Sequence, residues 1–122
     1  MVYLPVFFTL GGNQPEELWR GLYEPTGAAR PAAVAYDDMV AITTGATAFA
    51  PLPRGRGLGV DRPDGSAVVV WDQSLPAPPA GATATDPTGA PVAWSSTIDI
   101  GDTPVVVRSP RSLADLRADL GV

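Results

Sequence analysis

The stretch AVVVWDQSLP, residues 67–76, decides the fold because it contains the strongest strand signal in the chain. Its three consecutive valines have stiff β-branched side chains that pack well on a pleated sheet. Every position from Ala67 to Trp71 is apolar, which predicts a buried strand. We therefore expect a buried strand here, with Trp71 buried in the core.

Short β-like segments separated by turns surround this strand. Asp64-Gly65 indicates a two-residue hairpin turn, and Pro87-Thr88-Gly89 and Gly101-Asp102 also indicate turns. The proline-rich residues 75–81 predict a stiff connector that crosses between sheets or lies on the surface. We expect strands at 46–50, 57–62, 66–71, 82–86, 91–95, 97–100 and 103–108. Such short links favour antiparallel pairing, and the pattern is that of a sandwich or a barrel. We expect a mainly β fold, an antiparallel β-sandwich of about seven short strands.

An alanine-rich helix is predicted over residues 31–45. Pro31 suits the first position of a helix, and Gly45 stands where a helix would end. Helical spacing predicts that Asp37 and Asp38 point largely toward solvent. The expected buried face consists of Ala32, Ala35, Tyr36, Met39 and Ile42 or Thr43.

The C-terminal sequence SLADLRADLGV predicts a short amphipathic helix. Ser112 and Asp115 have the spacing of a capping box, and Gly121 marks the end. One face of this helix would carry Leu113, Leu116 and Leu120. A helix this amphipathic must pack on another part of the fold.

The N-terminal run VYLPVFFTL, residues 2–10, predicts a further apolar strand, and Pro5 places it at an edge, a start or a bulge. The run has no positively charged segment before it and is interrupted by Pro5, so it predicts neither a signal peptide nor a membrane span. We divide the chain into a strand-loop-helix unit over 1–45, a β-sandwich over 46–108 and a helical tail over 109–122. The compartment is not predicted.

Composition restricts the chemistry that this chain can perform. Its 122 residues suggest one folded domain and contain no Cys, His or Lys. Thiol nucleophiles, imidazole bases, Schiff-base lysines and metal sites built from thiolate or imidazole are therefore excluded. Eight arginines against 13 acidic residues give a net charge of −5, which disfavours binding to nucleic acid or to an anionic membrane. We predict no cofactor and no metal site.

The remaining carboxylates do not have the spacing expected of a catalytic pair. Asp37 and Asp38 are neighbours on the predicted helix, where adjacent side chains point about 100° apart. Glu16 and Glu17 are also adjacent, near a first helical turn where negative charge is favourable. The other candidates lie at strand ends or turns, where aspartate is common; they are Asp61, Asp64, Asp72, Asp86, Asp99 and Asp102. We assign no catalytic residue.

Aromatic side chains are the candidates for carbohydrate binding, because an aromatic face complements the apolar face of a sugar ring. Trp71 and Trp94 lie in predicted strands, where burial in the core is the better interpretation. Trp19 and Tyr23 lie in a predicted loop and are our candidate carbohydrate-binding residues. The glycines of RGRGLG, residues 54–59, lack the lysine of a phosphate loop and predict a turn before a strand.

Three stretches of the sequence, taken in order, form a wider pattern. Residues 2–42 read as a strand, a loop and a helix, residues 57–74 as a hairpin, and residues 82–109 as the strands that follow. Together they resemble the C-terminal end of bacterial clan A glycoside hydrolases, retaining enzymes with a (β/α)8 barrel followed by a small β-sandwich. The matching positions are Gly21-Leu22-Tyr23, Thr26-Gly27, Arg30-Pro31-Ala32, Ala35-Tyr36, Asp86, Gly89 and Pro104.

The resemblance implies that residues 2–10 correspond to the eighth barrel strand and that the predicted helix corresponds to the last barrel helix. Catalysis in that family uses two glutamates, which follow the fourth and seventh barrel strands, and no residue of this chain matches either. The resemblance therefore predicts a non-catalytic accessory portion that supports a barrel supplied elsewhere. Its partner would be a catalytic barrel chain or a second copy of itself.

Two alternatives from other functional classes stay open. The chain could be a stand-alone carbohydrate-binding module that uses Trp19 and Tyr23. It could instead be a structural or assembly protein that oligomerises through its N-terminal strand and C-terminal helix. An exposed aromatic platform would favour the first alternative, and a symmetric apolar interface would favour the second.

Overall fold

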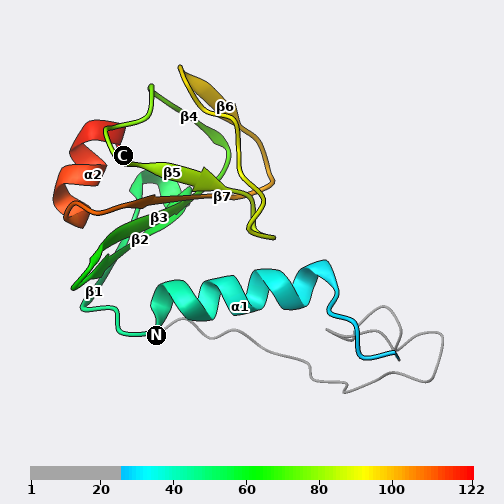
Figure 1. Ribbon diagram of the computed structural model, residues 1–122. Coiled ribbons are helices and arrows are strands. Elements are labelled where there is room, and N and C mark those ends of the chain that lie inside the picture. The colour runs from blue at the N-terminus through cyan, green and yellow to red at the C-terminus, as the bar shows by residue number, and fades with distance from the viewer. Residues whose placement is uncertain (1–25) are drawn as a thin grey trace.

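The computed structural model describes residues 26–122, and Figure 1 shows how the helices and strands of this range are arranged. The elements are α1 (Pro31–Thr43), β1 (Ala48–Pro51), the 3₁₀ turn η1 (Pro53–Gly55), β2 (Gly57–Arg62), β3 (Gly65–Val70), β4 (Gln73–Leu75), β5 (Thr83–Thr85), β6 (Ile98–Ile100), β7 (Val105–Ser109) and α2 (Leu113–Leu120). The mainly β architecture predicted from the sequence is confirmed. The strand predicted at residues 2–10 lies outside the described residues.

The strands form two antiparallel sheets. A five-stranded sheet has the order β1-β2-β3-β7-β5, and a two-stranded sheet pairs β4 with β6. In the central strand β3, Val68 lies opposite Gly59 of β2 and Val107 of β7. Residues Ser66 to Val70 are all buried, which confirms the buried strand predicted from the valine run.

The two faces of the five-stranded sheet are covered by different elements (Figure 1). On one face, α2 and the two-stranded sheet enclose the larger apolar cluster, which contains Leu52, Val68, Val70, Leu75, Ala84, Ile100, Val105, Val107, Leu113, Leu116 and Leu120. On the other face, α1 covers a smaller cluster formed by Ile42, Val60, Ala67, Val69 and Val106. Successive residues of β3 alternate between the two clusters, as the period of a strand requires. The connector at 75–81 links the two sheets, which is the first of the two predicted alternatives.

Local sequence signals fix both ends of α2. The side chain of Ser112 accepts a hydrogen bond of 3.2 Å from the backbone N–H of Asp115. Gly121 takes the left-handed conformation, with φ of 70°, that ends a helix. The helix buries Leu113, Leu116 and Leu120. The predicted cap, apolar face and end of this helix are confirmed.

α1 has the predicted ends but not the predicted orientation. It spans Pro31–Thr43, and Gly45 follows with a positive φ of 74°. Ala32 and Tyr36 were predicted to be buried but are exposed, whereas Asp38 was predicted to face solvent and is partly buried. The prediction was wrong because almost every position of this helix is apolar, so the sequence period cannot select one buried face.

Two strands differ from the prediction. The strand predicted at 91–95 is reduced to one isolated bridge between Pro91 and Thr85, which is made by hydrogen bonds from Val92 N–H to the carbonyl of Ala84 and from Asp86 N–H to that of Ala90. Residues 73–75 were predicted as no strand but form β4 and pair with β6. Asp72, just before β4, has a positive φ of 50°. This conformation turns the chain out of the five-stranded sheet.

The hairpin between β2 and β3 turns one residue earlier than predicted. Arg62 pairs with Gly65, so Pro63 and Asp64 form the turn. Gly65 belongs to β3, where an added Cβ would lie 2.3 Å from the carbonyl oxygen of Ser109. The glycine is therefore needed for the close approach of β7 and for its φ of 140° rather than for the turn itself.

Candidate functional site

Arg62, at the end of β2, binds the C-terminal end of α1. Its Nη1 donates hydrogen bonds of 2.8 Å to the carbonyl oxygens of Ala41, Ile42 and Thr44. Carbonyls in the last turn of a helix lack partners within the helix and carry the negative end of its dipole. The Nε of Arg62 donates a 2.9 Å hydrogen bond to the carboxylate of Asp64. Arg62 thus holds the last turn of α1 on the sheet.

A second arginine, Arg108 of β7, binds the middle of α1. Its Nη2 lies 2.5 Å from Oδ1 of Asp38, and its Nη1 donates a 2.9 Å hydrogen bond to the hydroxyl of Thr85 in β5. The side chains of Arg108 and Asp38 are 35% and 21% exposed, so the ion pair is partly shielded from water. Oδ2 of Asp38 is buried and has no hydrogen-bond partner among the described residues. Asp38 therefore positions α1 on the sheet.

The side of α1 that faces away from the sheet is largely apolar. Val34, Tyr36 and Val40 are 37%, 37% and 43% exposed. The only charged residues of the helix are Asp37, which is exposed, and the paired Asp38. A helix that is apolar on all sides is typical of one buried on all sides. In the part of the chain that the structure describes, α1 buries Ile42 toward the sheet and Ala33 on its other side, and it leaves Val34, Tyr36 and Val40 more than a third exposed.

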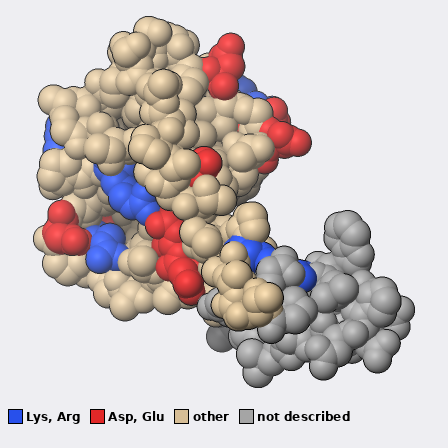
Figure 2. Space-filling model, turned by 45° about the vertical axis from the view of Figure 1, so that its right-hand side comes forward, with Lys and Arg blue, Asp and Glu red and all other residues tan. Residues whose placement is uncertain are grey.

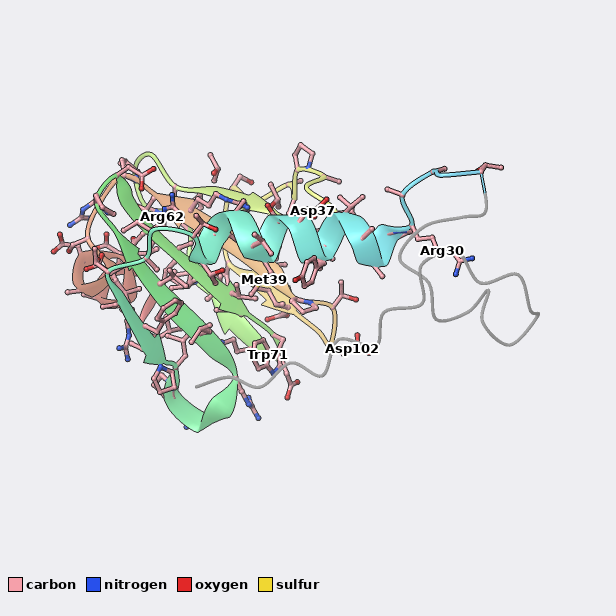
Figure 3. The ribbon with its side chains drawn as sticks, turned by 90° about the horizontal axis from the view of Figure 1, so that it is seen from below. Arg30, Asp37, Met39, Arg62, Trp71 and Asp102 are labelled. Atoms are coloured by element: carbon pink, nitrogen blue, oxygen red, sulfur yellow. The ribbon has the colours of Figure 1, made fainter. Side chains whose placement is uncertain are left out.

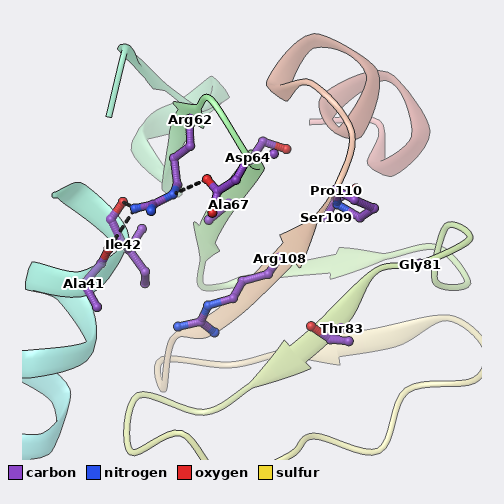
Figure 4. Close-up of a pocket in the computed structure, with 12 residues that line it drawn as sticks. Ala41, Ile42, Arg62, Asp64, Ala67, Gly81, Thr83, Arg108, Ser109 and Pro110 are labelled. Atoms are coloured by element: carbon purple, nitrogen blue, oxygen red, sulfur yellow. Dashed lines mark hydrogen bonds and ion pairs between the residues drawn. The ribbon is translucent and has the colours of Figure 1, made fainter. Parts of the chain in front are cut away.

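A pocket of about 370 Å³ lies beside the C-terminal end of α1 (Figure 4). It is lined by Ala41, Ile42, Arg62, Asp64, Gly65, Ser66, Ala67, Gly81, Thr83, Arg108, Ser109 and Pro110. Figure 2 shows basic and acidic side chains side by side around a hollow between the helix and the sheet. The pocket therefore combines guanidinium groups, a carboxylate, a hydroxyl and apolar side chains.

Two aspartates have lowered pKa values, and both belong to turns. The hydrogen bond from Arg62 holds the pKa of Asp64 below its ordinary value. The pKa of Asp86 is lowered mainly by the hydrogen bond from the Thr88 hydroxyl, helped by the backbone N–H groups of Thr88 and Ala90. Within residues 26–122, no group of three or more His, Cys, Asp or Glu could hold a metal ion. These two carboxylates stabilise local structure.

The candidate carbohydrate-binding residues, Trp19 and Tyr23, lie outside the described residues. Trp71 and Met39 are partly buried and both pack against the smaller cluster (Figure 3). Trp94 packs against the larger cluster, and its Nε1 donates a 2.9 Å hydrogen bond to a carbonyl of the proline-rich connector. Both tryptophans are therefore partly buried against the core rather than fully inside it.

Sequence reasoning missed the two arginines that hold α1. For Arg108 a signal was present, because it lies two positions after Val106 and the side chains of a strand alternate between faces. The residue therefore shares a covered face with a buried valine. No comparable signal identifies Arg62, whose partners are backbone carbonyls. The prediction for residues 54–59 is confirmed, because they form part of η1 and the beginning of β2.

Comparisons with known proteins do not place the chain in a family. No family model, no curated protein and no solved structure matches it. Neither helix in the described range is long and apolar enough to cross a membrane. Function must therefore be argued from the exposed side of α1 and from the pocket.

Proposed function

We propose that this chain is the non-catalytic C-terminal β-sandwich portion of a glycoside hydrolase-like protein and supports a catalytic (β/α)8 barrel supplied elsewhere. In this proposal α1 is the last barrel helix and lies between the barrel and the sandwich. The observation that carries the proposal is that three large apolar side chains of α1, those of Val34, Tyr36 and Val40, are each more than a third exposed.

A helix between two bodies needs two apolar sides, and the composition of α1 provides them. Ile42 and Met39 pack on the sandwich, while the three exposed side chains remain free to pack on a second body. The helices that surround a (β/α)8 barrel pack on its strands in this way. Complete burial of an apolar side chain contributes about 1.5–3 kcal/mol, so covering three partly exposed ones would contribute about 2–4 kcal/mol.

The two arginines also support this role. Arg62 and Arg108 fix α1 to the five-stranded sheet at its end and at its middle. A barrel that packs on the outer side of α1 would therefore be held rigidly against the sandwich. This is the mechanical function expected of an accessory domain, and it needs no catalytic residue in this chain.

The arrangement of carboxylates is consistent with a non-catalytic chain. The three glutamates lie between residues 16 and 24, before α1. Among the described residues, two aspartates share one partner. Asp115 and Asp119 both form ion pairs with Arg111 on the surface of α2. Assembly through the C-terminal helix is less well supported, because α2 buries its leucine face within this chain.

Affinity capture tests the proposal. The tagged chain is incubated with lysate of its source, and the captured proteins are identified by mass spectrometry and assayed for hydrolysis of aryl glycosides. We expect a (β/α)8-barrel polypeptide that carries the two catalytic glutamates and has glycosidase activity. Val40→Asp should abolish capture, because it places a charge in the proposed contact.

Phe49→Asp is the matched control. Phe49 is 55% exposed on the edge strand β1, away from the proposed contact, so this variant should capture the barrel as well as the unchanged chain does. Both substitutions are at exposed positions and should change the free energy of unfolding by no more than about 0.5 kcal/mol. Capture of no barrel, or equal capture by Val40→Asp, would contradict the proposal.

A further inference from the structure

The face of the five-stranded sheet that α1 covers changes from apolar to polar at one corner. Under α1 it presents apolar side chains such as Val60, Val69 and Val106. At the end of β7 the same face presents Arg108, which is paired in register with Thr83 of β5. This polar corner forms the floor of the pocket, whose volume of about 370 Å³ is within the range of small-molecule sites.

The charges of the pocket are balanced. Arg62 lies 2.9 Å from the carboxylate of Asp64, and Arg108 lies 2.5 Å from that of Asp38. Asp64 balances Arg62 within the pocket, and Asp38, which lies outside the lining, balances Arg108, so little charge is left to attract an anion. An anionic ligand would also meet Asp64, which is 73% exposed in the pocket wall.

The pocket nevertheless has unused hydrogen-bonding groups. Among the residues the structure describes, neither Nη2 of Arg62 nor Nε of Arg108 makes a hydrogen bond. Asp64 and Thr83 add an exposed carboxylate and an exposed hydroxyl. Figure 4 shows Arg108 and Thr83 on neighbouring strands, with Arg62 and Asp64 at the opposite side of the pocket. Donors and acceptors therefore line the same cavity.

We propose that this pocket binds a neutral polyhydroxylated ligand, of which a single sugar residue is the simplest. Neighbouring hydroxyl groups can accept hydrogen bonds from the guanidinium groups and donate one to the carboxylate of Asp64. The apolar side chains of Ile42, Ala67 and Pro110 provide a wall for the C–H face of the ring. The site is formed by this chain alone, so it goes beyond the barrel-supporting function and does not depend on it.

Two-dimensional NMR titration of the isotopically labelled full chain tests the inference. The probes are the methyl glycosides of glucose, galactose, mannose and xylose, with sodium sulfate as an anion probe. We expect at least one glycoside to shift the backbone amides of Gly65, Thr83 and Ser109 with a dissociation constant in the millimolar range. Thr83→Val should weaken binding about fivefold, the effect of losing one hydrogen bond.

Asp64→Asn distinguishes a sugar site from an anion site. It should weaken glycoside binding about fivefold because the charged acceptor is lost. An anion site would respond in the opposite way, since the substitution removes a negative charge and releases Arg62. The matched controls are Asp102→Asn and Thr97→Val, at exposed positions outside the pocket, which should leave binding unchanged.

Three results would overturn the proposal. The first is that no glycoside shifts the pocket amides at concentrations well above the millimolar range. The second is that sulfate shifts them more strongly than any glycoside and that Asp64→Asn strengthens this effect. The third is that a glycoside binds but neither Thr83→Val nor Asp64→Asn weakens it. Binding is measured on the chain by itself, so these results are independent of whether the chain captures a barrel.

Discussion

The two helices of this domain are built in opposite ways. α2 places three leucines on the sheet and turns charged residues outward, where Arg111 pairs with Asp115 and Asp119. α1 packs Ile42 and Met39 on the sheet but leaves Val34, Tyr36 and Val40 more than a third exposed. α2 has one apolar face that packs on the sheet and one charged face that is exposed to water. α1 has instead the composition of a helix that packs on apolar neighbours on two sides.

The helices also differ in how they are held. α2 has a side-chain cap at its N-terminus and a left-handed glycine at its end, both supplied by adjacent residues. α1 has no side-chain hydrogen bond at its N-cap, and its C-terminal carbonyls are bound by Arg62 from a distant strand. α2 is therefore stabilised largely by residues within and next to it, whereas α1 is stabilised by contacts with the sheet on which it packs.

The largest expected effect is the loss of a leucine under α2. Leu116 is fully buried in the larger cluster, so Leu116→Ala should lower the free energy of unfolding by about 2–5 kcal/mol. Val40→Ala on the outer side of α1 should lower it by no more than about 0.5 kcal/mol. Chemical denaturation followed by tryptophan fluorescence measures both. Equal effects would mean that the outer side of α1 is packed within this chain.

Removing the arginine at the end of α1 should have the next largest effect. Arg62→Met loses three hydrogen bonds to backbone carbonyls and should lower stability by about 1–3 kcal/mol. In this variant, hydrogen exchange should be accelerated more at the backbone amides of α1 than at those of α2, each compared with the unchanged chain. Arg54→Met, which changes an exposed arginine in η1, is the control. Equal loss of protection in both helices would argue against a specific role of Arg62 in holding α1.

A smaller effect is expected from the cap of α2. Ser112→Ala removes the acceptor for the Asp115 backbone N–H and should lower the free energy of unfolding by about 1 kcal/mol. Ser96→Ala, in an exposed bend, is the control and should change little. Denaturation midpoints measure both variants. An unchanged midpoint for Ser112→Ala would show that the capping hydrogen bond contributes no stability beyond that of the packed leucines.

The smallest effect concerns pH. Because the folded pKa of Asp64 is lowered by Arg62, the ionised form is favoured by folding. The resulting stabilisation is present above the unfolded pKa of about 3.9 and is lost as the pH falls through the lower folded pKa. NMR titration of this carboxyl should give a midpoint below the ordinary value, and Arg62→Met should raise it. An unchanged midpoint in the variant would contradict the assigned cause.

The same contrast explains what the sequence could predict. The bounds, cap and buried face of α2 follow from residues close together in the chain, and β3 follows from its own valines. The ends of α1 were predicted from Pro31 and Gly45. Its buried face was not, because an apolar helix gives no periodic signal and its orientation depends on Arg62 and Arg108.

Features that depend on distant partners were not predictable. β4 contains only three residues, and its strand conformation depends on pairing with β6, where Ser74 lies opposite Asp99. Gly65 was assigned to a turn because the approach of Ser109 from another strand leaves no local trace. The pocket was also missed, because β2, β5, β7 and α1 all contribute to its wall.

The most direct test of the barrel-supporting role is hydroxyl-radical footprinting of the chain alone and in its complex with the captured barrel. Tyr36 and Phe49 are both exposed in the described structure, one on α1 and the other on β1. The proposal predicts that oxidation of Tyr36 falls strongly in the complex while oxidation of Phe49 is unchanged. Unchanged oxidation of Tyr36, or protection of Phe49 in its place, would contradict it.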